Sequence, residues 1–504
     1  MDAFAGLYSG FQNALTLQNI YLCFIGCLWG SMVGVLPGIG PLAGITLLIP
    51  ITYGIEPTGA IIMLAGIYYG AMYGGSTTSI LLNIPGESAS VVTCLDGYQM
   101  ALRGRAGAAL FIAAIGSWIG GTISIVGVML LSPVLADIAT KFGPGELFAL
   151  LMVALLLLSS LGTASFLKTL AMIIMGMLAG TVGMDTLTGA YRFTHGFMDL
   201  YDGLGFVPVA MGMFGIGEIL STTEQSITRE VYRPRLRELL TTWNEFRASI
   251  GPILRGSILG FFIGLLPGAA HILSSFMSYT VEKRLAQRPE EFGTGRIEGV
   301  AGPETANNAA TGGAMIPFLA LGIPTTPAIA VIMIALLIHG IRPGPLFISE
   351  NPELFWTLIA SMYIGNVLLV LLNLPLIGLF VSLLRVPFGI LFPIILFICL
   401  IGTYSVSYSS FDLVVLLGFG FMGYFFRKLG YDLAPFVLAL IIGPLIEETF
   451  RQALMGSGGS LSIFYQSPIT LMFMSIAAVL LGFNILKSLR SGRKEGIDTG
   501  SEGS

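Results

Sequence analysis

The sequence predicts an all-α polytopic membrane protein with two homologous repeats that contain broken or re-entrant helices. Of its 504 residues, 55% are hydrophobic and 10% are charged, whereas a soluble domain carries about 25% charged residues. Apolar runs such as 150–161, 368–384 and 469–486 lie in stretches that approach or reach the roughly 20 residues that a membrane-spanning helix needs. The 66 glycines and 25 prolines lie mostly inside apolar segments, where some glycines are expected to allow close helix packing and others cluster with proline at breaks. In lipid, a broken helix survives only where it faces protein or a water-filled cavity.

Hydropathy predicts the membrane segments in chain order, and the short ones are candidates for half-helices or re-entrant hairpins. The segments of the first half are 18–36, 39–55, 58–73, 74–86, 107–135, 145–162, 166–184 and 203–221. The segments of the second half are 251–266, 269–281, 304–323, 326–348, 354–384, 388–404, 410–426, 433–450 and 466–487. The predicted domains are a first repeat half at 1–221, a polar loop at 222–250, a second repeat half at 251–486 and a disordered tail at 487–504.

Charged residues at the segment ends predict the orientation. The central loop and the start of the tail are rich in arginine and lysine, which favour the cytoplasmic side. The first 55 residues carry only the charge of Asp2, so the N-terminus is free to lie outside. It lacks a basic stretch and a cleavage site, and we expect the first helix to be retained. The net charge of -4 gives no basis for binding nucleic acid.

Three sequence matches in the same order indicate an internal repeat. Gly30–Gly38 matches Gly260–Gly268 at an offset of 230, and Gly74–Pro85 matches Gly313–Pro324 at an offset of 239. The stretch 104–107 resembles 340–344 at about the same spacing. Secondary transporters are commonly built from two such repeats, with substrate held at broken helices near the midplane. Their orientation depends on the number of crossings between them, and we expect them to be inverted, with a scaffold and a transport domain.

Each half contains two Gly/Pro breaks, at 36–41 and 83–88 in the first half and at 266–270 and 322–327 in the second. Hydroxyls and amides surround them. A helix start exposes backbone N–H groups that favour an anion, and hydroxyl and carbonyl oxygens also suit a sodium ion. Alternatively, the Ser and Thr side chains only bond back to their own helix or join helices. The candidate substrate- or ion-binding residues are Pro37, Gly38, Gly40, Ser76, Thr77, Thr78, Ser79, Asn83, Pro85, Gly86, Glu87, Pro267, Gly268, Asn307, Asn308, Thr311, Pro324, Thr325 and Thr326.

Charged residues inside membrane segments are costly and are therefore functional candidates. Glu87 directly follows a break, and it either binds a cation or lies at the headgroup level. Glu304 is a candidate for neutralising a coupling ion, whereas we interpret Asp96 as a helix end. The three histidines are dispersed and predict no metal site. His271 alone lies near a predicted site, where it is a candidate for proton coupling.

The motifs at the breaks resemble a known family, the large membrane subunit of tripartite tricarboxylate transporters (the TctA family). The resemblance extends to about Leu486 and rests on 34–41, 74–86, 95–98, 183–194, 303–309 and 321–324. It implies a small four-helix membrane subunit, a periplasmic solute-binding protein, a small carboxylate substrate such as citrate, and a bacterial inner-membrane location. The resemblance also implies that a sodium or proton gradient drives the transport. Thr325 departs from the family pattern, which usually has glycine there, and this bears on the identity of the substrate.

The leading hypothesis is an alternating-access carrier. It would be an elevator if a mobile domain carries both pairs of breaks past a scaffold. The scaffold would come from 107–162 and 354–404. An anion channel with re-entrant hairpins is the alternative, because paired hairpins also build pores. An enzyme is not expected, since the sequence has no His-Glu-x-x-His, Gly-x-Ser-x-Gly or phosphate-loop motif. No cofactor is expected, and no metal beyond a transported sodium ion.

Overall fold

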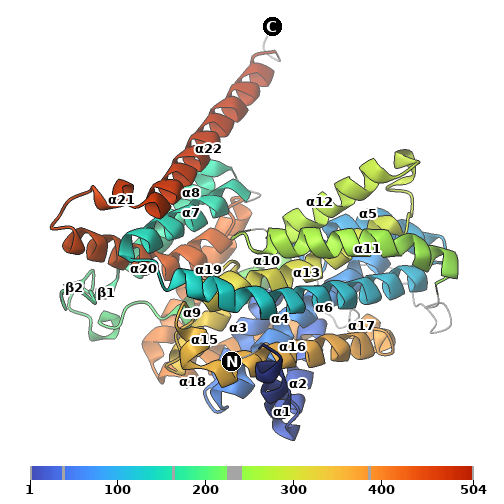
Figure 1. The fold of residues 1–504 in the computed structure, drawn as a ribbon, viewed down its shortest axis with the longest axis horizontal. Coiled ribbons are helices and arrows are strands. Elements are labelled where there is room, and N and C mark those ends of the chain that lie inside the picture. The colour runs from blue at the N-terminus through green and yellow to red at the C-terminus, as the bar shows by residue number, and fades with distance from the viewer. Residues whose placement is uncertain are drawn as a thin grey trace. The chain divides into compact units, whose positions relative to one another are not determined.

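A computed structural model describes residues 3–36, 40–161, 165–223, 241–268, 270–383 and 388–501, and nearly all of them lie in helices (Figure 1). In these ranges the strands form one short hairpin, β1 (Gly183–Met184) with β2 (Tyr191–Arg192). Six of the described helices are long and apolar enough to cross a membrane. They contain the spans Leu17–Val35, Ala106–Ala139, Trp243–Gly264, Pro352–Asn373, Ser410–Lys428 and Pro468–Leu486. This confirms the predicted all-α polytopic membrane protein.

The chain divides into two compact units. The first comprises Met1–Ala139, Val207–Leu266 and Ala270–Tyr424, and the second comprises Thr140–Phe206, Pro267–Ala269 and Phe425–Ser504. The helices of the first are α1 (Ala3–Ala14), α2 (Leu17–Val35), α3 (Gly40–Thr52), α4 (Pro57–Leu82), η1 (Ser88–Ser90), α5 (Val91–Leu102), α6 (Ala106–Ala139), α9 (Phe206–Ala210), η3 (Met211–Ile216), α10 (Gly217–Thr223), α11 (Trp243–Gly264), α12 (Ala270–Leu285), η5 (Pro289–Glu291), α13 (Glu298–Leu321), α14 (Pro327–Ile338), α15 (Phe347–Glu350), α16 (Pro352–Asn373), α17 (Ile377–Leu383), α18 (Phe388–Ser407) and most of α19 (Ser410–Lys428). The second contains α7 (Pro144–Leu161), α8 (Phe166–Gly180), η2 (Met198–Leu200), α20 (Ala434–Gly456), α21 (Ile463–Gln466) and α22 (Pro468–Ser501).

Two helix pairs in the first unit pack through rows of glycine spaced four residues apart. On α2, Gly26, Gly30 and Gly34 lie directly against the backbone of α4 at Met63, Ile67 and Ala71. On α11, Gly256, Gly260 and Gly264 lie against the backbone of α13 at Gly302, Ala306 and Ala310. A β-carbon at any of these six glycines would overlap a carbonyl group. Small residues at this spacing let helices in a membrane approach closely.

This packing corrects one predicted boundary. The sequence predicts separate segments at 58–73 and 74–86, but α4 is one continuous helix from Pro57 to Leu82. Its internal glycines Gly70 and Gly74 face the backbone of α2 near Cys27 and Ser31, so their function is close approach and not a break. The predicted segment 354–384 is divided into α16 and α17, and α1 and α5 were not predicted.

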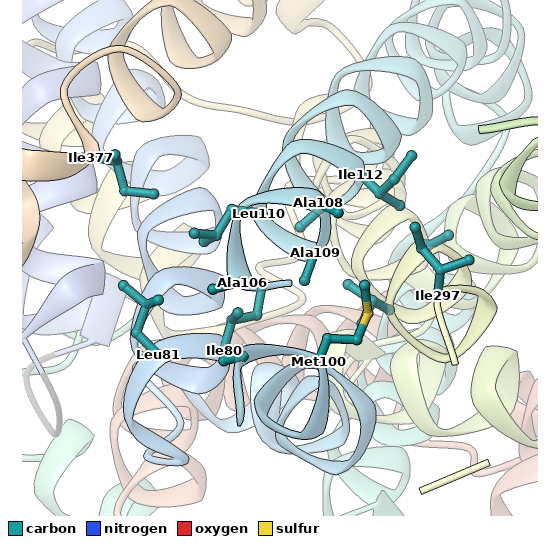
Figure 2. Close-up of a cluster of buried hydrophobic side chains, with 14 of the residues drawn as sticks. Ile80, Leu81, Met100, Ala106, Ala108, Ala109, Leu110, Ile112, Ile297 and Ile377 are labelled. Carbon is teal, nitrogen blue, oxygen red and sulfur yellow. The ribbon is translucent and has the colours of Figure 1, made fainter. Parts of the chain in front are cut away.

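A buried apolar cluster includes the end of α4, just before the break at 83–88, which we call the first break (Figure 2). Ile80 and Leu81 at the end of α4 lie with Met100 of α5, Leu110 of α6 and Ile297 just before α13. All five are at most 7% exposed. Close packing of these side chains holds α4, α5, α6 and α13 together around the turn at residues 83–90.

In the second unit, α7, α8 and α20 pack on one another and α7 also packs on α22. Phe148 of α7 stacks near Phe450 and Phe464, with ring centroids 5.1 and 5.0 Å away. The hairpin is tied to α20, because Arg451 Nη1 lies 2.9 Å from Asp185 Oδ2. Hydrogen bonds from Thr188 and Arg451 hold the pKa of the Asp185 carboxyl well below its usual range.

The predicted scaffold segments, 107–162 and 354–404, do not all lie in one compact unit. Residues 107–139 and 354–404 of the predicted scaffold lie in the same unit as the breaks at 83–88 and 322–327, and 140–162 lie in the other. Helix α22 includes 487–501, for which the sequence predicts disorder. Residues 224–240 of the predicted polar loop lie outside the described ranges.

Candidate functional site

The first break follows α4 and is set by Asn83. This residue is the C-cap of α4 in the left-handed conformation, with φ 58°, and its backbone N–H donates to the carbonyl of Thr78. Asparagine tolerates this conformation better than most residues, and Pro85, two residues on, cannot continue the helix. The side chain of Asn83 is exposed. Gly86 lies against the backbone of Gly34 with no room for a β-carbon.

The second break follows α13 and has the same local form. Gly322 is the left-handed C-cap, with φ 69°, and Pro324 follows two residues later. Thr325 is fully buried, and its hydroxyl donates to the carbonyl of Ala314 at 3.2 Å. Thr326 caps the N-terminus of α14, since its Oγ1 accepts from the N–H of Ile329 at 3.3 Å. The hydroxyl of Thr325 is thus used within the protein.

Each break contacts the long helix that precedes the other break. Beyond the first break, Glu87 Oε1 accepts from Asn307 Nδ2 of α13 at 3.0 Å. Beyond the second break, Thr326 Oγ1 lies 3.5 Å from the hydroxyl of Tyr68 in α4. The two contacts are reciprocal, because α4 leads into the first break and α13 into the second.

Glu304 is a buried carboxylate, 1% exposed, in the first half of α13. Its Oε2 accepts from Ser76 Oγ of α4 at 2.5 Å, and its Oε1 accepts from the hydroxyl of Thr93 in α5. Its backbone carbonyl accepts from Ser117 Oγ of α6 at 3.4 Å and from Asn308 Nδ2 at 3.1 Å. Glu304 therefore joins four helices of the first unit.

Neither Glu304 nor Glu87 forms an ion pair with lysine or arginine in the described part of the chain. The partners of Glu87 are Asn307 and the N–H of Ala89, which donates to Oε2 at 2.7 Å. A buried ionised carboxylate without a cationic partner is expensive. The pair of carboxylates thus provides a place where a proton or a metal cation would be stabilised.

His271 of α12 lies beside the second break and links the two long helices. Its Nε2 lies 3.0 Å from the hydroxyl of Tyr68 and 3.3 Å from Thr311 Oγ1. The side chain is 6% exposed. Tyr68 thus contacts both His271 and Thr326, so the N-terminal end of α14 is connected to α4, α12 and α13.

Two further hydroxyls of α4, those of Thr78 and Ser79, bond back to their own helix. Thr78 Oγ1 and Ser79 Oγ donate to the carbonyl of Gly75 at 3.2 and 3.0 Å. Ser79 Oγ also lies 2.8 Å from Ser90 Oγ, in the turn after the break. These two hydroxyls follow the alternative in which Ser and Thr bond back to the backbone.

Two small cavities border Tyr73 of α4. One has a volume of about 20 Å³, and its lining includes Tyr69, Asn308, Thr311 and Asn366. The other has a volume of about 10 Å³, and its lining includes Ser76, Thr77, Ser117 and Asn373. A cavity of about 10–15 Å³ can hold one water molecule. Both cavities therefore have room for one small polar particle.

The remaining candidates lie apart from these contacts. Pro37 and Gly38 lie outside the described residues. Gly40, with φ 60°, begins α3, and a β-carbon there would meet nothing within 4 Å. Pro267 and Gly268 form the turn between α11 and α12, where Gly268 has φ 121°. The described residues contain no group of three or more His, Cys, Asp or Glu that could hold a metal ion.

Sequence reasoning missed several residues that the structure brings to this region. Tyr68, Thr93, Ser117, Asn366 and Asn373 all hydrogen-bond across helices here. A polar residue inside an apolar helix was the available signal, because such residues are costly in lipid and face partners inside the bundle. Their partners are far away in the chain, so the sequence pattern does not identify them.

Comparisons with known proteins give a consistent result. A family model described as "Tripartite tricarboxylate transporter TctA family" matches residues 20–438. An "Uncharacterized 52.8 kDa protein in TAR-I ttuC' 3'region" of Agrobacterium vitis is 48% identical over 493 residues, which cover 98% of each chain. An "Uncharacterized protein in TAR-II ttuC' 3'region" of the same organism is 47% identical over 236 residues, 47% of this chain and 98% of the relative. No solved structure matches.

Proposed function

Because the chain belongs to the tripartite tricarboxylate transporter TctA family, we propose that it is the large translocating subunit of a binding-protein-dependent secondary transporter. It imports small carboxylates, such as citrate or a related di- or tricarboxylate, across the bacterial inner membrane. A periplasmic solute-binding protein delivers the substrate, and a small four-helix membrane subunit completes the complex. A sodium or proton gradient drives uptake.

The contacts between helices support two homologous repeats in this transporter. The offset of 230 aligns Gly30 with Gly260, and the offset of 239 aligns Ile67 with Ala306. Gly30 contacts Ile67, and Gly260 contacts Ala306 in the same way. The offset of 239 also carries Asn83 onto Gly322, and both are left-handed helix caps. Equivalent positions thus have equivalent packing, which a chance similarity of glycine-rich sequence would not produce.

The reciprocal contacts between each break and the opposite long helix support the proposed location of the substrate. The offset of 239 aligns Tyr68 with Asn307, and it aligns Glu87 with Thr326. The hydrogen bond of Asn307 with Glu87 and the contact of Tyr68 with Thr326 are therefore equivalent under the repeat. We place the carboxylate near these two contacts, where the hydroxyl of Tyr68, the amide of Asn307 and the start of α14 offer neutral donors. Neutral donors bind an anion that must be released again, and helix starts favour negative charge.

In this proposal, substrate is transported because the part of the protein that contains the site moves as one rigid body. Both breaks lie in the first compact unit together with α6 and α16, so a movement of that unit would expose the site alternately to the two sides. Glu87 and Glu304 supply the charge that a coupling cation or proton would neutralise. The second unit has helices without such breaks, and we assign it the role of the scaffold.

Reconstitution tests the proposed function. Proteoliposomes would contain this chain, its small membrane subunit and a binding protein loaded with a labelled carboxylate, and the sodium and proton gradients would be imposed separately. We expect uptake that requires both the binding protein and one of the gradients. Flux that persists without a gradient and without the binding protein would contradict the carrier and favour the anion channel.

A further inference from the structure

We propose that the cavity lined by Ser76, Thr77, Ser117 and Asn373 is a sodium site, and that the ion is charge-balanced by Glu304. The cavity also borders Tyr73 and apolar side chains of α6, and its volume is about 10 Å³. That is room for one particle no larger than a water molecule. The proposal rests on the proposed function, because it names the coupling ion of the same site.

Asn373 supplies the observation that points to a ligand. Its side chain is 6% exposed, and its Oδ1 has no hydrogen-bond partner among the described residues. Its Nδ2 is used fully, since it donates to Ser31 Oγ at 3.1 Å and to the carbonyl of Leu369 at 2.9 Å. These two donations fix the orientation of the amide, so the unpartnered atom is the oxygen. A buried acceptor without a partner costs about 1–3 kcal/mol, which a bound cation would remove.

The hydroxyls on the opposite side of the cavity are also arranged as acceptors. Ser76 gives its proton to Glu304 Oε2, so the lone pairs of its oxygen remain for a cation. Ser117 gives its proton to the backbone carbonyl of Glu304 and accepts from Asn308 Nδ2 at 2.7 Å. Oxygen atoms from hydroxyls and amides are the ligands that hard cations prefer.

The charge at the cavity selects a monovalent ion. Glu304 is a single carboxylate, joined to the cavity through Ser76, and no lysine or arginine pairs with it within the described ranges. One positive charge neutralises it, whereas a divalent ion would remain half balanced in a medium of low dielectric. Neither this cavity nor the one beside Tyr69 has a carboxylate in its lining. Only this one has a lining hydroxyl, that of Ser76, which donates to a carboxylate within the described ranges, so the cavity beside Tyr69 suits a water molecule better than a cation.

The ligands come from separate helices, and this couples the ion to the substrate. Ser76 belongs to α4, Ser117 to α6 and Asn373 to α16, and Glu304 of α13 also binds Thr93 just after the first break. An ion in the cavity would therefore stabilise the arrangement of α4, α5, α13 and α16 around residues 83–90. Loss of the ion would leave both Asn373 Oδ1 and the Glu304 charge uncompensated.

The test is binding of radioactive sodium to the purified chain in detergent, without carboxylate or binding protein. Asn373→Leu removes the acceptor and keeps a similar volume. Asn484→Leu is the matched control, because Asn484 is also a buried asparagine whose Nδ2 donates to a serine hydroxyl, Ser159 Oγ, at 3.1 Å. We expect saturable sodium binding, an apparent Kd raised about tenfold or more by Asn373→Leu, equivalent to about 1.4 kcal/mol, and no change in Asn484→Leu.

The proposal is overturned if the wild-type chain binds no sodium, or if folded Asn373→Leu binds sodium with the wild-type affinity. Where size-exclusion chromatography shows that Asn373→Leu does not fold, Ser76→Ala is judged by the same criterion. Sodium binding is measured without transport, so its absence leaves the proposed transporter intact. Intact sodium binding without carboxylate uptake in proteoliposomes would count against the proposed function instead.

Discussion

At the scale of single residues, the two breaks owe their form to positions that only a few side chains can occupy. Asn83 and Gly322 both lie in the left-handed region, which costs roughly 1–2 kcal/mol for most residues. Glycine avoids that cost, and asparagine reduces it. Asn83 additionally presents an exposed amide, so it differs from Gly322 in having a group that can contact a substrate.

Substitution of Asn83 separates its backbone role from its side-chain role. We expect both Asn83→Ala and Asn83→Gly to abolish carboxylate uptake while membrane insertion survives, because each lacks the amide. Only Asn83→Ala adds the left-handed penalty, and its thermal midpoint in detergent should be lower than that of Asn83→Gly. Wild-type uptake by Asn83→Gly would show that the residue acts through the backbone alone.

The residue scale also shows how far sequence reasoning reaches. The Asn-Ile-Pro and Gly-Ile-Pro motifs predict both breaks, because proline and left-handed residues act locally. The hydrogen bond of Glu304 with Ser76 joins residues 228 positions apart, and no local pattern encodes such a pair. The sequence made Glu304 a candidate from its charge alone, and it did not indicate Thr93, Ser117 or Asn373.

At the scale of elements, glycine determines which helices pair. The sequence interpretation gave the glycines two roles, packing and breaking, and placed a break inside 58–86 where packing was the reason. Gly70 and Gly74 look like breaking residues in the sequence, and only the neighbouring α2 shows that they permit contact with Cys27 and Ser31. Packing against a partner is a property of two helices, so one helix's sequence does not reveal it.

Adding one methyl group to a packing glycine tests this assignment. In Gly30→Ala the β-carbon would overlap the backbone of Ile67, and overpacking of this kind costs about 1–3 kcal/mol. We expect a lower thermal midpoint for the purified chain, with the same sign in Gly260→Ala.

Gly418 provides the matched control for that pair. It lies inside helix α19, and a β-carbon there would meet nothing within 4 Å. Alanine favours a helix over glycine by about 1 kcal/mol, so Gly418→Ala should leave the midpoint unchanged or raise it. Equal midpoints for all three variants would contradict close packing at Gly30 and Gly260.

At the scale of the whole molecule, the account depends on two repeats that exchange contacts at their breaks. The sequence predicted the repeat from three matches and could not determine its orientation, because the short segments hide the number of crossings. Inverted repeats place the start of α2 and the start of α11 on opposite sides of the membrane. The basic residues around 229–247 predict that the start of α11 lies in the cytoplasm.

Cysteine accessibility tests this orientation. Single cysteines would replace Leu15, before α2, and Thr241, before α11, in a chain whose four native cysteines are substituted. We expect an impermeant thiol reagent added outside whole spheroplasts to label the first and not the second. Labelling of both residues from the same side would show that the repeats are parallel.

The central claim is that the carboxylate binds where the first break contacts α13 and the second break contacts α4. Ser88 is exposed and follows Glu87 directly, so a single cysteine at Ser88 would report on that site. The measurement is the rate at which a permeant maleimide modifies Ser88→Cys with and without a carboxylate that the reconstituted system transports. The exposed Ser460→Cys, in the second unit, serves as the control. We predict that the transported carboxylate slows modification of Ser88→Cys and leaves Ser460→Cys unchanged. Equal rates at Ser88→Cys with and without a saturating transported carboxylate would contradict the account.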